Sequence, residues 1–169
     1  MLYYHFGGKR DLYRALLRTI FGQVSTTLEG IASNGATPDV QLRDAIGAMA
    51  AFVQTERHFP AIMLREVADG GAHLDAATLE TLGSIPQAIA TIIGRGVAAG
   101  RFRPVQPIAA YFSIVAPLVV FMAGAPIRRE MSGRRSLRTP MPDTDAFVQH
   151  VQDLAARMLC IPKATGRTS

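Results

Sequence analysis

The chain has 169 residues, of which 49% are hydrophobic and 18% charged, and this balance predicts a globular protein and excludes a disordered chain. The single cysteine, Cys160, excludes a disulfide scaffold and is compatible with the cytoplasm, where we expect the protein to act. The net charge of +5 permits contact with nucleic acid or an anionic membrane but demonstrates neither. Charges at Lys9, Arg10 and Asp11 interrupt the first residues, so no signal peptide is predicted.

Helical periodicity runs through most of the chain, and strand signals are nearly absent, so we predict an all-α fold. The predicted helices span residues 9–32, 38–57, 61–68, 79–97, 107–123 and 145–159. Thr37 and Pro38 suit the start of the second helix, and Pro86 predicts a kink or a break in the fourth. Residues 125–143 contain turn formers and charges without a helical stripe, so we predict a long, mobile loop there.

The stretch from Ile108 to Ile127 carries no charge over twenty residues, which is long enough for a membrane span. Pro117 and several small residues weaken that interpretation. A helix buried in a core or in a dimer interface explains the same composition. We therefore expect no contact with a membrane.

The opening residues read LYYHFGGKRDLYRALL, an aromatic-rich segment followed by a glycine pair and a helix that begins at Lys9. This sequence resembles the tetracycline-repressor (TetR) family of transcription regulators, in which the recognition helix of a helix-turn-helix ends in such a motif. Arg10 stands where that family often has an acidic residue. A tyrosine hydroxyl donates well to a phosphate oxygen, and a lysine at a helix N-terminus forms an anion site. The expected DNA-binding residues are Tyr3, Tyr4, His5 and Lys9. A hydrophobic staple at an ordinary helix start is the simpler alternative.

The resemblance implies three parts: residues 1–8 as the end of the recognition helix and its turn, 9–162 as a helical ligand-binding and dimerisation domain, and 163–169 as a disordered tail. Most of the helix-turn-helix is absent from the sequence, because Met1 falls where a recognition-helix residue belongs. The implied function is a ligand-responsive, DNA-binding transcriptional regulator, a repressor that a small molecule releases from its operator. A small helical membrane-associated or adaptor protein without a DNA role is the alternative.

The resemblance also implies a homodimer in which the helices at 108–123 and 145–159 pair with their copies. The expected interface residues are Val115, Leu118, Val119, Met122, Phe147, Val151, Leu154 and Met158. A pocket for a small apolar or amphipathic effector is expected among flexible and aromatic residues of the central helices, with Arg65, Glu66 and His73 as polar contacts. Its expected residues are Met49, Phe52, Phe59, Met63, Glu66, Ile89, Ile93, Tyr111 and Phe112. Ordinary core packing is the alternative for each of them.

Enzymatic chemistry has little support in the sequence. The four histidines lack the spacing of a metal site, and Cys160 has no evident activating base. Ser113 and Ser132 lack the surroundings of a catalytic nucleophile. We therefore expect no catalytic residue, no metal and no cofactor.

Overall fold

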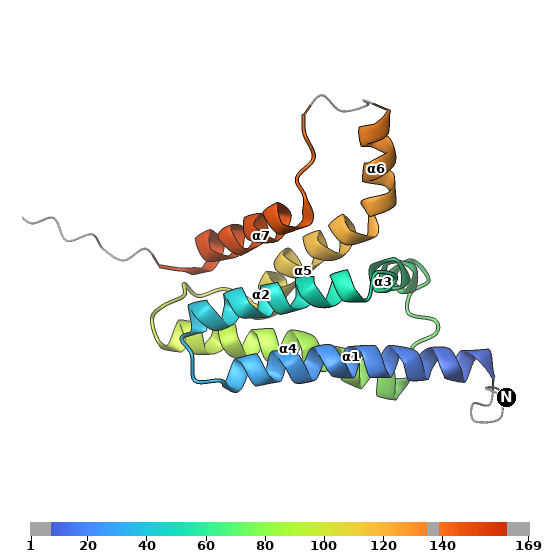
Figure 1. The fold of residues 1–169 in the computed structure, drawn as a ribbon. Coiled ribbons are helices and arrows are strands. Elements are labelled where there is room, and N and C mark those ends of the chain that lie inside the picture. Colours follow the sequence, from blue (N-terminus) through green and yellow to red (C-terminus); the bar gives the residue numbers. More distant parts are fainter. Residues whose placement is uncertain (1–7, 135–138, 162–169) are drawn as a thin grey trace, which may run out of the picture.

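The computed structural model describes residues 8–134 and 139–161, and it confirms the all-α fold (Figure 1). The described residues form the helices α1 (Lys9–Ser33), α2 (Pro38–Thr55), α3 (Phe59–Ala68), α4 (Ala76–Ala98), α5 (Pro107–Ala123), α6 (Ala125–Gly133) and α7 (Thr144–Leu159). Their only β-type pairing is an isolated bridge between Phe102 and Cys160. Backbone hydrogen bonds from Arg103 to Leu159 (2.8 Å) and from Ile161 to Arg101 (3.0 Å) accompany this bridge.

Helices α1 and α4 pack along each other and run in the same direction (Figure 1). The Ser25 and Ser84 hydroxyls hydrogen-bond at 2.6 Å near the middle of the pair, and Arg95 donates to the carbonyl of Ala32 near its end. Helix α2 covers both α1 and α4, while α5 contacts α2, α3, α4 and α7. Leucine, isoleucine and phenylalanine side chains from these helices form one continuous core.

Several helix boundaries follow directly from the sequence. Pro38 and Pro107 occupy the first positions of α2 and α5, where the missing N–H removes no helical hydrogen bond. Gly100 follows the end of α4 and has a φ of 65°, a left-handed conformation that favours glycine and stops the helix. Asp75 and Asp143 cap α4 and α7 by accepting hydrogen bonds from backbone N–H groups at 2.9 and 2.8 Å.

The predicted loop at 125–143 was wrong in part, and of the two alternatives predicted at Pro86 the break does not occur. Helix α4 passes through Pro86 without a break, because Ile85 and Ile89 on either side are buried in the core and hold the helix in place. Residues 125–133 of the expected loop form α6, which rises away from the other helices (Figure 1). Arg128 anchors α6 by lying 3.5 Å from the centre of the Phe121 ring, and no residue of α6 is buried, so no apolar stripe marked it in the sequence.

Within residues 8–134 and 139–161, no single helix is long and apolar enough to cross a membrane. Only α5 and α6 together reach the necessary length and composition, and they are bent by 55° where they meet.

Candidate ligand-binding site

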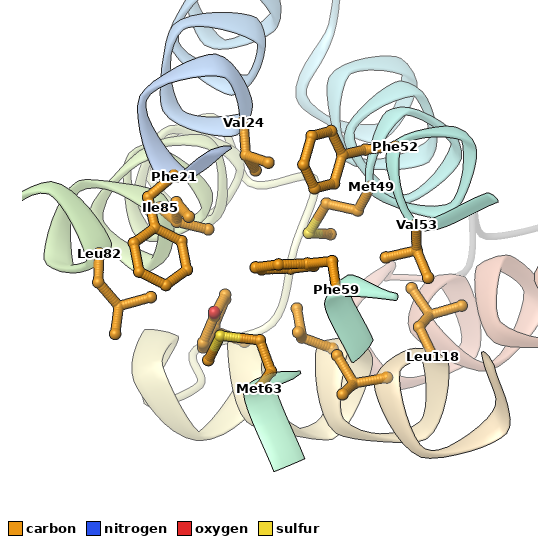
Figure 2. A pocket seen from close by; sticks show the side chains of 13 residues that line it. Phe21, Val24, Met49, Phe52, Val53, Phe59, Met63, Leu82, Ile85 and Leu118 are labelled. Carbon is orange, nitrogen blue, oxygen red and sulfur yellow. The ribbon is translucent and has the colours of Figure 1, made fainter. Parts of the chain in front are cut away.

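An apolar cavity lies between α1, α2, α3, α4 and α5 (Figure 2). Its empty space, including the opening to solvent, measures about 530 Å³. The lining residues are Phe21, Val24, Met49, Phe52, Val53, Phe59, Met63, Leu82, Ile85, Tyr111, Val115, Leu118 and Val119. Five helices therefore contribute to one cavity, which is the usual construction of a small-molecule site in a helical protein.

Three phenylalanine rings from different helices meet at this cavity. Phe59 of α3 lies between Phe21 of α1 and Phe52 of α2 (Figure 2). It contacts each of them edge to face, with ring centroids 5.8 and 5.4 Å apart. This geometry is the favourable one for aromatic pairs, so the position of α3 depends on both α1 and α2.

The structure brings five of the nine expected ligand-binding residues to the cavity, namely Met49, Phe52, Phe59, Met63 and Tyr111. Ile89 and Ile93 are instead buried in the core and do not line it. Phe112 points outward with 61% of its surface exposed, because it follows Tyr111 on α5 and therefore faces a different side of the helix. Glu66 lines a separate cleft.

Sequence reasoning missed α1 as a cavity wall. Phe21 and Val24 belong to the apolar stripe of that helix, and a stripe alone does not distinguish cavity wall from packed core. It also placed Val115, Leu118 and Val119 in the dimer interface, whereas all three line the cavity.

Tyr111 supplies the polar side-chain group of an otherwise apolar lining, apart from the methionine sulfurs. The residue is 8% exposed, and its hydroxyl makes no hydrogen bond within the described part of the chain. Burial raises the pKa of this phenol, so it stays neutral and retains its proton. The hydroxyl is therefore a hydrogen-bonding group without a partner at an apolar cavity.

A second cleft lies beside α1 and α3 and is polar. Its lining consists of Lys9, Arg10, Tyr13, Ile62, Arg65, Glu66 and His73. The expected polar contacts Arg65, Glu66 and His73 thus come together, but outside the apolar cavity.

Glu66 is the centre of this polar cleft and is only 2% exposed. Its Oε1 atom accepts a hydrogen bond of 2.6 Å from the Tyr13 hydroxyl and lies 3.1 Å from Nδ1 of His73. Its Oε2 atom is buried and has no hydrogen-bond partner among the described residues. Burial and the hydrogen bond to Glu66 raise the pKa of Tyr13 to about 12.

These contacts tie the beginning of α1 to α3 and to the segment before α4. The Tyr13–Glu66 hydrogen bond links α1 to α3, while Arg14 donates to the carbonyl of His73 at 3.0 Å. Arg14 also lies 3.9 Å from a carboxylate oxygen of Asp75. Side chains rather than backbone packing make these links, so they are readily broken by a small displacement.

Of the expected DNA-binding residues, Lys9 is exposed in the first turn of α1. Tyr3, Tyr4 and His5 lie outside the described residues, as do most of the expected first part, 1–8, and the expected tail, 163–169. Their roles stay predictions.

The apolar face that remains uncovered lies mainly on α5. Phe112, Ala116 and Val120 recur every four residues and are all exposed, with Phe112 at 61% and Val120 at 57%. Of the other expected interface residues, Leu154 on α7 is 50% exposed, whereas Val151 is buried within the protomer, as is the cavity-lining Leu118. Half-buried positions hold Met122, Phe147 and Met158.

Residues 38–154 match the family model of the tetracyclin repressor-like C-terminal domain. The chain belongs to this family. The TetR family is one of transcriptional regulators, and the match covers α2 to α5, α6 and most of α7. No curated protein matches the chain in a sequence comparison.

Two solved structures share the TetR-like fold of the chain. One is a protein of unknown function from Rhodococcus sp. RHA1, with a TM-score of 0.70 and 19% identity, covering 93% of this chain and 77% of that one. The other is the TetR family transcriptional regulator PfmR from Thermus thermophilus, with a TM-score of 0.60 and 23% identity, covering 92% of this chain and 79% of that one.

Proposed function

We propose that the chain is the sensor and dimerisation part of a DNA-binding transcriptional repressor, which a small apolar effector releases from its operator. One observation carries this proposal: α1 lines the apolar cavity with Phe21 and Val24 and presents Lys9 at its beginning. A molecule in the cavity therefore contacts the same helix that leads to the expected DNA-binding segment.

The length of α1 converts a small tilt into a useful displacement. Phe21 and Lys9 are twelve residues apart, or about 18 Å along the helix axis. A tilt of about 5° at Phe21 moves Lys9 by about 1.6 Å. Two recognition helices in a dimer must match half-sites whose spacing the DNA repeat fixes, so opposed displacements in the two protomers weaken both contacts. The effector must bind the released conformation more tightly for this to occur.

Helix α3 provides a second route from the cavity to α1. Phe59 and Met63 line the cavity, and Glu66, one turn further along α3, accepts the hydrogen bond from Tyr13. A ligand that displaces α3 also strains this hydrogen bond. We infer that cavity occupancy acts on α1 at its middle through Phe21 and at its beginning through Tyr13.

The uncovered face of α5 supports a homodimer as the active form. A charge-free stripe of Phe112, Ala116 and Val120 is an unfavourable surface to leave in water. A second copy of the chain is the occupant we propose, because TetR family members typically act as dimers. Leu154 of α7 is a further exposed apolar side chain.

Analytical ultracentrifugation of two arginine variants tests the dimer. Ala116→Arg introduces a charge at the centre of the proposed interface and should give monomers. Thr91→Arg is the matched control, because Thr91 is exposed on α4, away from this face. A wild-type chain that sediments as a monomer, or an Ala116→Arg variant that stays dimeric, contradicts the proposed interface.

The DNA role is tested with the natural product of the gene, tagged at its carboxyl end and expressed from its own promoter. Chromatin immunoprecipitation should enrich a small set of sites with two-fold symmetric sequences. Lys9→Ala should weaken binding at all sites alike. It should also reduce the slope of the logarithm of the binding constant against the logarithm of the salt concentration by roughly one. Loss of the protein should raise transcription next to those sites. If the tagged protein enriches no DNA site, the proposed role as a transcriptional regulator is refuted.

A further inference from the structure

The walls of the apolar cavity contain no charged side chain and a single hydroxyl. None of the lining residues is acidic or basic, and the charged groups Arg65 and Glu66 lie in the separate polar cleft. A charged ligand in the cavity would lose its hydration without gaining a counter-charge. The cavity therefore selects uncharged molecules.

Tyr111 distinguishes this cavity from a plain hydrophobic core. Only 8% of the residue is exposed, and its hydroxyl has no hydrogen-bond partner among the described residues. The oxygen itself still borders open space at the cavity, because the fully buried side-chain oxygen without a partner in the described part of the chain belongs to Glu66. A ligand that fills the cavity shuts this hydroxyl off from water, so a ligand group that pairs with the hydroxyl avoids the cost of leaving it unpaired. The aromatic rings of Phe21, Phe52 and Phe59, together with the sulfurs of Met49 and Met63, favour an aromatic ring as the rest of the ligand.

We infer that the effector is an uncharged, largely aromatic molecule with one hydrogen-bonding group, which pairs with the Tyr111 hydroxyl. This inference rests on the proposed function, since it assumes that the effector occupies this cavity.

Three matched probes test the chemistry of the cavity. N-phenyl-1-naphthylamine is neutral and carries one N–H group, and 1-benzylnaphthalene replaces that N–H by a methylene. 8-Anilino-1-naphthalenesulfonate adds a negative charge to the first probe. Isothermal titration to the wild-type chain should give the tightest binding for the neutral amine. Binding of the methylene probe should be weaker by roughly threefold to tenfold, the usual value of one hydrogen bond, and binding of the sulfonate to the cavity weaker by at least about tenfold.

Two variants assign the effect to Tyr111 and to the cavity. Tyr111→Phe should reduce the affinity of the amine by roughly threefold to tenfold and change that of the methylene probe by less than about twofold. Met63→Trp narrows the cavity and should abolish binding of both neutral probes. Any binding that survives Met63→Trp occurs elsewhere on the surface and is subtracted. Helical circular dichroism of each variant shows that the fold is retained.

Two results would overturn the inference. The first is that Tyr111→Phe changes the affinities of the amine and of the methylene probe by the same factor, including no change in either. The second is that the sulfonate binds in the cavity as tightly as the amine. These outcomes are distinguishable from failure of the proposed function. If the probes bind as expected but the natural gene product enriches no DNA site, the cavity chemistry holds and the regulator role fails. If DNA sites are enriched but Tyr111→Phe has no selective effect, the regulator role holds and the effector class is wrong.

Discussion

Replacing Tyr13 by phenylalanine removes one oxygen atom from the polar cleft and leaves the ring in place. That oxygen donates a 2.6 Å hydrogen bond to Glu66, whose carboxylate is 2% exposed. Hydrogen bonds to charged groups contribute about 1.5–3 kcal/mol, so we expect Tyr13→Phe to lower the free energy of unfolding by about 2 kcal/mol. For a chain of this length, that corresponds to a melting temperature lower by about 4–8 °C.

Urea unfolding followed by circular dichroism measures this cost, at one fixed protomer concentration because dimerisation adds to apparent stability. Tyr111→Phe is the matched control, since the Tyr111 hydroxyl has no partner within residues 8–134 and 139–161, and it should cost less than about 0.5 kcal/mol. In a Glu66→Gln background the bond is no longer charge-assisted, and Tyr13→Phe should cost only about 1 kcal/mol. The reasoning fails if Tyr13→Phe costs no more than Tyr111→Phe, or if its cost is the same in both backgrounds.

Two further predictions concern stability. Gly96→Ala places a Cβ atom in overlap with the buried Phe102 ring and should destabilise the protein by about 3 kcal/mol. At Gly94 on the same helix an added Cβ meets nothing within 4 Å, so Gly94→Ala should stabilise the protein by up to about 1 kcal/mol. Thermal unfolding of both variants measures this contrast, and equal effects would contradict it. The pKa of Tyr13, about 12 in the folded protein, lies above its ordinary value, so the folded state keeps a proton that the unfolded state loses. The stability that this raised pKa contributes is therefore present below about pH 10 and is lost as the pH rises to about 12. Tyr13→Phe should reduce this alkaline loss of unfolding free energy by about 1 kcal/mol, after solvent screening is allowed for. Wild-type and variant curves of unfolding free energy against pH that run parallel would refute this prediction.

The helices were predictable wherever burial leaves a periodic signal. The stripe of α1 and the prolines that open α2 and α5 gave correct elements. Helix α6 was missed because its residues contact solvent on most sides. The break that was one alternative at Pro86 does not occur, because tertiary packing outweighs the lost hydrogen bond.

The candidate site was predictable only in part, because periodicity does not reveal which side of a helix meets which neighbour. Met49, Phe52 and Met63 were identified as cavity residues from residue type, but the adjacent residues Tyr111 and Phe112, predicted together, lie on different faces of α5. The first lines the cavity, and the second belongs to the uncovered face. Similarly, Glu66 was predicted as a polar contact of the effector pocket, but it lies in the separate polar cleft. Its partner Tyr13 is 53 positions away in the sequence, and no local pattern connects them.

Helices α5 and α7 are fastened together at both ends, and this has a mechanical consequence. Phe121 and Phe147 stack with parallel rings at one end, while the backbone bonds around Phe102 and Cys160 join the end of α7 to the segment that leads into α5. The pair is therefore stiff, whereas the beginning of α1 is restrained by a few side chains only. When a force acts on packed helices, the least restrained helix moves first. In the proposed mechanism, a molecule entering the cavity would therefore displace α1 rather than α5 and α7, and the proposed dimer surface would keep its position while that helix moves.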